Sequence, residues 1–203
     1  MADADTMLPD VITESNYLLR MADGTIKQVN PFTGTEVWTV PGRGNRPLGV
    51  ADKEGQPLDP AKADDHCSFC ARRYLATPPE KARLVRTGDG YETLYNVNAE
   101  RLHETVADFR RVANLFEIVS CDYWQKNFGY TLPDAVEARM NDYLSTEAGR
   151  NHVLEVLEGR MKLSGADPAR IQGMPVEEKL QMATGFFGGG HELIIARRHF
   201  VDG

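Results

Sequence analysis

Short apolar runs separated by turn residues dominate about the first 120 positions of the sequence. Gly, Pro and Asn lie between these runs, and the Thr87–Gly90 segment predicts a hairpin turn. The runs with the alternation and the β-branched or aromatic content of strands are Tyr17–Met21, Glu36–Val40, Arg83–Arg86, Glu92–Asn98 and Leu115–Val119. This part of the chain is therefore predicted to form a platform rich in strands.

The pattern changes to helical spacing after residue 121. One helix is predicted to start at Pro133 and to run to about residue 144, and Ser145 is the predicted N-cap of a second helix. The apolar stripe of this second helix comprises Val153, Leu154, Val156, Leu157 and Met161. A third helix is predicted to open at Pro175, and Leu193–Arg197, which follows a glycine turn, predicts a last strand.

These changes of pattern divide the chain into an arm, a platform and an inserted segment. Residues 1–13 are acidic and lack periodicity, which predicts a flexible N-terminal arm. Residues 14–121 and 186–203 form the strand-rich platform, and residues 122–185 form a mostly helical insertion. The predicted fold class is therefore α+β.

Composition narrows the function mainly by exclusion. The 203 residues carry a formal net charge of −7, so we expect no nucleic-acid partner, because phosphate affinity requires clustered Lys and Arg. The longest apolar run, around Leu193–Ala196, is far shorter than the roughly 18 residues of a membrane-spanning helix, so no membrane partner is expected. Three cysteines do not make a secreted disulfide framework, which favours a cytoplasmic location.

The sharpest local motif is the pair of cysteines in Cys67-Ser68-Phe69-Cys70. A tight turn can aim both sulfurs at one soft cation, and Zn²⁺ is the usual one, although it requires four ligands. A redox pair and two ordinary reduced cysteines remain alternatives on spacing alone. Candidates for the remaining zinc ligands are His66, His103, Cys121, His152, His191 and His199.

Two arginines lie in a loop rich in Gly and Pro that follows a predicted strand. The guanidinium groups of Arg43 and Arg46 could grip a phosphate or a diphosphate, since each can form bidentate hydrogen bonds. The alternative is a pair of solvated arginines on a surface loop. Gly188–Gly190 could allow a close backbone approach to a ligand, but such a glycine run is more typical of a flexible turn.

Three further residues have reactive side chains to which no ligand or reaction is assigned. His103 and His152 lie in polar surroundings of helical character, which predicts that both are exposed. Cys121 is predicted to be a buried small apolar residue. The residues alone therefore give a metal clip and an anion loop as candidates, each beside its alternative, and they indicate no reaction.

Four blocks of the sequence, taken in order, resemble the N-terminal half of the galactose-1-phosphate uridylyltransferase family, within the histidine-triad superfamily. That family has an Asn-Pro-Leu-Thr-Gly turn, a strand and an Arg-x-x-Arg-Pro loop, then Cys-x-x-Cys with Thr-Pro-Pro-Glu, then Asn-x-Phe, and last a strand ending in Ser-Pro-x-His. The corresponding blocks here are NPFTGTEVWTVPGRGNRP at 30–47, CSFCARRYLATPPE at 67–80, ANLFEIVS at 113–120 and GHELIIARRH at 190–199. The resemblance implies a histidine-triad-like antiparallel sheet flanked by helices, and it leaves out the helical insertion.

The resemblance also implies roles for individual residues. By this resemblance, Cys67, Cys70 and His199 take the positions of three structural zinc ligands. Arg43 and Arg46 take those of the arginines near the substrate phosphates, and Phe69 and Asn114 take those of the nucleotide contacts. Leu115 departs from the family pattern, which often has a charged residue at this position near the ribose. Arg197-Arg198 replaces the usual Ser-Pro before the histidine.

The function implied is that of a zinc-containing nucleotidyltransferase that acts on a nucleotide sugar or a dinucleotide. Members of the family transfer the nucleotidyl group through a covalent intermediate on a histidine of a His-Pro-His motif, and this chain contains no His-x-His. No catalytic residue is therefore expected here, and the chain is expected to be the N-terminal half of a longer enzyme.

The alternative is a non-catalytic, zinc-stabilised binding or scaffold protein on the same fold. A homodimer, which members of the family commonly form, is a candidate assembly. The helical insertion is a candidate surface for a protein partner, because the chemistry of the family does not require it.

Overall fold

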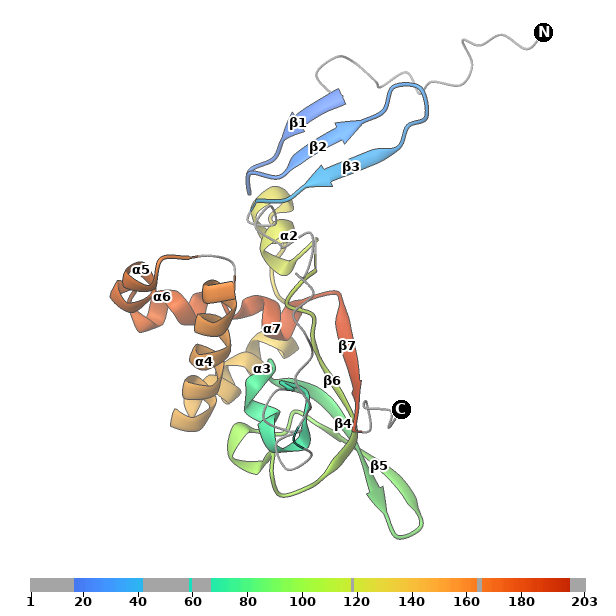
Figure 1. Ribbon diagram of the computed structural model, residues 1–203, viewed down its shortest axis with the longest axis vertical. Coiled ribbons are helices and arrows are strands. Elements are labelled where there is room, and N and C mark those ends of the chain that lie inside the picture. The colour runs from blue at the N-terminus through green and yellow to red at the C-terminus, as the bar shows by residue number, and fades with distance from the viewer. Residues whose placement is uncertain (1–16, 42–58, 60–66, 118, 164–165, 198–203) are drawn as a thin grey trace, which may run out of the picture.

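The computed structural model describes residues 17–41, 59, 67–117, 119–163 and 166–197. Within these ranges the chain is α+β, with two antiparallel sheets and several helices (Figure 1). The coarse prediction of fold class is thus confirmed. No helix in the described ranges is long and apolar enough to cross a membrane.

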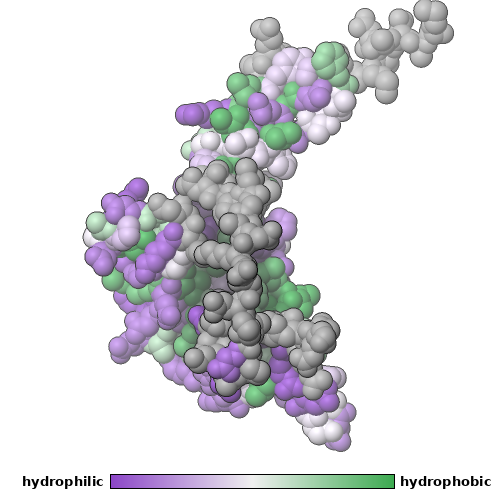
Figure 2. Space-filling view, in the orientation of Figure 1, coloured by the Kyte–Doolittle hydropathy of each residue, from purple (hydrophilic) through white to green (hydrophobic). Residues whose placement is uncertain are grey.

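The smaller sheet contains three short strands in the order β1-β2-β3. They are β1 (Leu18–Arg20), β2 (Ile26–Val29) and β3 (Glu36–Thr39). The turn between β2 and β3 is built by Asn30, whose side chain accepts a hydrogen bond from Phe32 N at 2.9 Å, and by Gly34, whose positive φ of 68° suits glycine. Both faces of this sheet carry exposed apolar side chains, including those of Leu18 and Trp38. Figure 2 shows hydrophobic residues among hydrophilic ones on the visible face of the small sheet.

This small sheet projects from the rest of the molecule next to α2 (Cys121–Phe128) (Figure 1). The Asn127 side chain of α2 accepts a hydrogen bond from Ala22 N at 2.8 Å, and the Tyr123 hydroxyl donates to Met21 Sδ at 3.5 Å. A three-stranded sheet that buries neither face has little stability of its own. The described contacts with α2 hold it through the turn between β1 and β2.

The larger sheet has four antiparallel strands in the order β5-β4-β6-β7. They are β4 (Glu80–Thr87), β5 (Gly90–Tyr95), β6 (Ala107–Ala113) and β7 (Glu192–Ala196). Strands β4 and β5 form the predicted hairpin, and two short 3-10 helices, η3 (Ala71–Ala76) and η4 (Ala99–Arg101), flank it. The last strand, β7, pairs with β6 although the two are separated by all the remaining helices.

Helices fill the sequence between β6 and β7. After α2 come α3 (Asp134–Ser145), α4 (Glu147–Leu163), α5 (Pro168–Gly173), α6 (Val176–Gln181) and α7 (Thr184–Gly188). Local sequence fixes several of the ends: Ser120 Oγ accepts from Tyr123 N at the start of α2, and Gly129 ends it at a φ of 66°. The first and third predicted helices are confirmed as α3 and α6.

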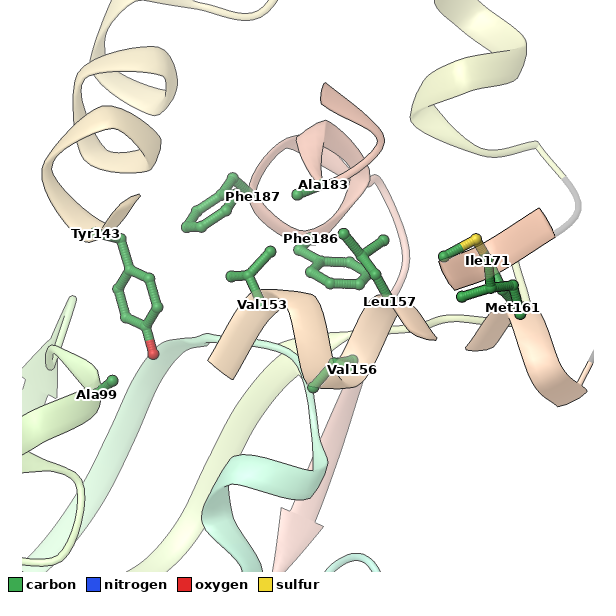
Figure 3. Packing of buried hydrophobic residues seen from close by; sticks show 10 residues of the cluster. All are labelled: Ala99, Tyr143, Val153, Val156, Leu157, Met161, Ile171, Ala183, Phe186 and Phe187. Atoms are coloured by element: carbon green, nitrogen blue, oxygen red, sulfur yellow. The ribbon is translucent and has the colours of Figure 1, made fainter. Parts of the chain in front are cut away.

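The main hydrophobic core lies where these helices meet the larger sheet. Val153 and Leu157 of α4 pack with Phe186 and Phe187 of α7, and Ala99 of η4 belongs to the same cluster (Figure 3). The helical segment and the platform therefore share this core.

A buried ionic cluster joins β4 to β6 beneath η3. The Glu80 carboxylate accepts from Arg83 Nε at 2.6 Å, from Arg83 Nη2 at 2.9 Å and from Arg110 Nε. The Tyr74 ring lies 4.8 Å from the Arg83 guanidinium carbon and 4.5 Å from that of Arg110, and the Thr77 hydroxyl accepts from Arg110. Two cations with one carboxylate are tolerated here because hydrogen bonds and the aromatic face offset their desolvation.

Three predictions from the sequence are wrong. Residues 115–117 form a turn rather than a strand, and the strand lies just before them as β6. Ser145 ends α3 and donates to Asp142 O, while Thr146 Oγ1 accepts from Gly149 N at the start of α4. His152 is only 2% exposed, because its ring lies between the Tyr143 hydroxyl and a backbone carbonyl.

Candidate functional site

The two cysteines of the Cys-x-x-Cys motif form a tight turn immediately before η3. Phe69 N donates to Cys67 Sγ at 3.4 Å, and Cys70 N donates to Cys67 O at 3.3 Å. Cys70 is 4% exposed, Cys67 is half-buried, and the two are not joined by a disulfide. A backbone N–H directed at a sulfur stabilises a thiolate, which is the form that binds metal.

The 3-10 helix that follows this turn contacts the larger sheet at the end where β7 finishes. Tyr74, four residues after Cys70, accepts a hydrogen bond from Ala107 N at 3.1 Å, where β6 begins. The end of β7 pairs with the same part of β6, and Arg197 N donates to Asp108 O at 2.8 Å. The chain is therefore directed toward this end of the sheet as it approaches the position of the predicted third ligand.

Several predicted site residues lie outside the described residues. They are Arg43, Arg46 and the third predicted zinc ligand, His199, together with the candidate ligand His66. Within the described ranges, no group of three or more His, Cys, Asp or Glu side chains could hold a metal ion. The zinc site and the arginine loop thus stay predictions.

The two predicted nucleotide contacts belong to segments anchored at opposite ends of β6. Phe69 is half-exposed in the cysteine turn, which connects through η3 to the start of the strand. Asn114 follows the end of the strand, where its N–H donates to His191 O at 3.0 Å and its side-chain oxygen accepts from Phe116 N at 2.9 Å. The seven residues of β6 span about 20 Å.

A groove of about 420 Å³ lies beside the start of β6. Asp108 lines this groove, and its carboxylate pairs with Arg86 at 3.4 Å and with Arg197 at 3.0 Å. A smaller cavity of about 30 Å³ lies at the Asn114 end, next to Glu117 and Cys121. That volume suits about two water molecules and no larger ligand.

Two of the other candidate ligands have the pKa shifts that burial causes. Burial raises the pKa of the Cys121 thiol, and the nearby charge of Glu117 adds to this effect. Cys121 is 2% exposed, so the prediction that it is buried is confirmed. Burial lowers the pKa of His152, whose ring nitrogens are within hydrogen-bond distance of Tyr143 Oη at 2.6 Å and of Thr77 O at 2.8 Å. Both side chains are therefore buried, and burial favours the neutral form of each.

A pair that the sequence does not reveal lies beside Asn114. The Glu117 carboxylate accepts from His191 N at 3.2 Å and lies 3.3 Å from His191 Nδ1. These residues are 74 positions apart in the sequence, so only the pairing of β6 with β7 brings them together. The Gly-Gly-Gly-His turn is the one local signal that indicates them.

Comparison with known proteins adds a family but no activity. Residues 21–203 match a family described as a domain of unknown function, DUF4921. The chain belongs to this family. No curated protein and no solved structure matches the chain at a significant level. The DUF4921 match covers β2 and β3, the whole larger sheet and the whole helical segment, so the helices belong to the family's own domain.

Proposed function

We propose that this DUF4921 chain is the zinc- and nucleotide-binding part of a nucleotidyltransferase with a histidine-triad-like fold. The observation that carries the proposal is the cysteine turn, in which a backbone N–H donates to Cys67 Sγ and Cys70 is buried beside it. Two sulfurs placed on such a turn make half of a tetrahedral zinc site. The order of the blocks that resemble the uridylyltransferase family supplies the rest of the argument.

In this proposal Cys67 and Cys70 bind zinc with His199 and a fourth ligand. The described part of β7 runs toward the end of the sheet that Tyr74, four residues after Cys70, contacts. A third ligand eight residues after His191 would approach the cysteine turn from this direction. Zinc would fix the turn to the sheet, since a closed site of this kind contributes folding energy rather than chemistry.

The nucleotide would be held at the Asn114 end of β6, with Arg43 and Arg46 offsetting the charge of its phosphates. Phe69 belongs to a segment anchored about 20 Å away, at the other end of the strand, so we do not assign it to the same nucleotide. Arginine is suited to this role because a planar guanidinium forms two parallel hydrogen bonds to one phosphate. The substrate class is a nucleotide sugar or a related dinucleotide. We place no nucleophile in this chain, so the bond-breaking step would require the histidine motif that it lacks.

The zinc part of the proposal is tested by elemental analysis of the purified protein. We expect about one zinc per chain, lost when Cys67 or Cys70 is replaced by Ser. Cys121→Ser is the matched control, because this third cysteine is buried in a separate part of the fold and should leave the zinc content unchanged. Zinc that is unaffected by Cys67→Ser and Cys70→Ser would overturn the assignment.

The nucleotide part is tested by calorimetry of the zinc-loaded protein with UDP-glucose, ADP-glucose and a diadenosine polyphosphate. Binding of at least one of them, weakened by Asn114→Ala, is the expected result. Failure of all three to bind would refute the nucleotide assignment. Binding without transfer, in protein that includes any downstream His-x-His segment, would favour the alternative, a zinc-stabilised binding protein.

The surface of the small sheet supports a proposal about assembly. Leu18, Leu19, Val37 and Trp38 expose apolar side chains on β1 and β3. An exposed apolar surface on a sheet of marginal stability is typical of an interaction site. A homodimer is the assembly that the family resemblance implies, and the helical segment stays the candidate surface for a different protein partner.

A further inference from the structure

The turn Gly188–His191, which leads into β7, is held rigidly against the end of the larger sheet. Gly189 N donates to Gly185 O at 3.1 Å, and Gly189 O accepts from Lys81 Nζ at 3.0 Å. A side chain on Gly189 would meet Gly185 O at 2.7 Å and Glu117 Oε1 at 3.1 Å. Glycine is therefore required here so that Glu117 can pack under the turn.

Glu117 is a buried carboxylate whose described hydrogen bonds all come from one residue. Its side chain is 5% exposed, and it contacts both the backbone N–H and the Nδ1 atom of His191. Burial of a carboxylate is costly unless it is hydrogen-bonded and paired. In the imidazolium form His191 supplies both, because Nδ1–H donates to Glu117 and the ring carries the compensating charge.

The other side of the imidazole faces outward. The His191 side chain is 64% exposed, and within the described ranges Nε2 has no hydrogen-bond partner. A buried carboxylate that orients an exposed imidazole fixes its tautomer and direction, as the partners of ligand-binding histidines commonly do. Burial of the Glu117 carboxylate lowers the stability of the fold, and in return it fixes the direction of one exposed N–H group of the His191 ring.

The group lies beside the segment that carries the proposed nucleoside contact. Asn114 N donates to His191 O at 3.0 Å, and Glu117 follows Asn114 by three positions in the same turn. The small cavity beneath them is too small for a ligand, so a ligand would lie on the outer side, over the exposed ring. Lys81 and Arg111 both pair with Glu192, and the side chain of His191, at 64% exposed, faces solvent more than either of them.

We propose that His191 binds a phosphate group of the nucleotide through Nε2 and that Glu117 is its positioning residue. The inference rests on the proposed function for the identity of the ligand, whereas the pair itself rests on the contacts above. A phosphate on the Nε2 side and the carboxylate on the Nδ1 side would each accept a hydrogen bond from one ring nitrogen. Free phosphate and a nucleotide phosphate share this chemistry, so the experiment separates them.

The test follows the ring nitrogens of His191 by two-dimensional ¹⁵N NMR of the full chain, titrated separately with inorganic phosphate, ADP and UDP. We expect the Nε2 signal to move and saturate with a nucleotide. His191→Phe should raise the Kd for that nucleotide by tenfold or more. Glu117→Gln should raise it about threefold and change the tautomer signature of His191 in the protein without ligand, a change that loss of stability alone does not produce.

His103→Phe is the matched control, because His103 is also exposed but stacks on Tyr74 at the other end of β6. The Kd of this variant for the nucleotide should equal that of the wild type. If a nucleotide binds and His191→Phe changes its Kd by less than twofold, the inference falls and the proposed function stands. If no nucleotide binds but inorganic phosphate moves the His191 signal, the proposed function falls and the phosphate site stands. If none of the three ligands moves the signal, the inference is wrong.

Discussion

Replacement of Glu80 by Gln should destabilise the protein severely, because it leaves two buried guanidinium groups without a counter-charge. Glu80 is 2% exposed, and its two oxygens accept from Arg83 and Arg110, which are themselves almost fully buried. Removal of one partner from a buried ionic cluster costs about 3–5 kcal/mol. For a chain of this size that corresponds to a fall in Tm of roughly 10 °C.

The measurement is urea unfolding at neutral pH, followed by circular dichroism. Glu104→Gln is the matched control, because Glu104 also pairs with an arginine three residues away, Arg101, at 3.0 Å, but both side chains are more than half exposed. The control should lose less than about 0.5 kcal/mol. If Glu80→Gln lost less than about 1 kcal/mol with an unchanged m value, the cluster would not be the clamp between β4 and β6 that we describe.

Two further predictions concern helix α4. Gly149→Ala should lower the free energy of unfolding by several kcal/mol, because the added Cβ would lie 1.9 Å from Tyr143 O. Gly159→Ala, in the same helix, places its Cβ in open space and should raise the free energy of unfolding by up to about 1 kcal/mol. Equal effects of the two variants in chemical denaturation would contradict this packing. Burial lowers the pKa of His152, so the unfolded chain binds this proton at higher pH than the folded protein, and stability should fall as the pH falls below about 6.5. His152→Gln should flatten this part of the curve of unfolding free energy against pH, and an unchanged slope would show that other groups cause it.

Local patterns were enough to predict the elements whose residues follow a simple rule. The β4–β5 hairpin and helix α3 carry their own turn and start signals, and the Cys67–Cys70 spacing is readable without any fold. The sequence pattern does not predict strand β6, because charged Arg110 lies in its buried face and breaks the alternation of apolar and polar residues. In such a strand the ionic cluster, not hydrophobicity, decides which side chains point inward.

Long-range pairing explains the rest of what the sequence did not reveal. The polar neighbours of His152 indicated an exposed helix surface, but α4 carries its ring under Thr77, 75 positions away. Glu117 and His191 have no sequence signal as a pair, because one follows β6 and the other precedes β7. Neither partner can be found from periodicity, which reports on one element at a time.

The pairing of β7 with β6 also has a kinetic consequence. Ala113 and Glu192 are neighbours in the sheet, yet about 80 residues separate them, so closing this loop costs conformational entropy before any ladder hydrogen bond forms. Helices α2 and α7, at the two ends of the intervening segment, pack against each other and bring the strand ends together. Refolding should therefore proceed with the helices first and the edge strand last, and the Glu117–His191 pair should be among the latest contacts to form.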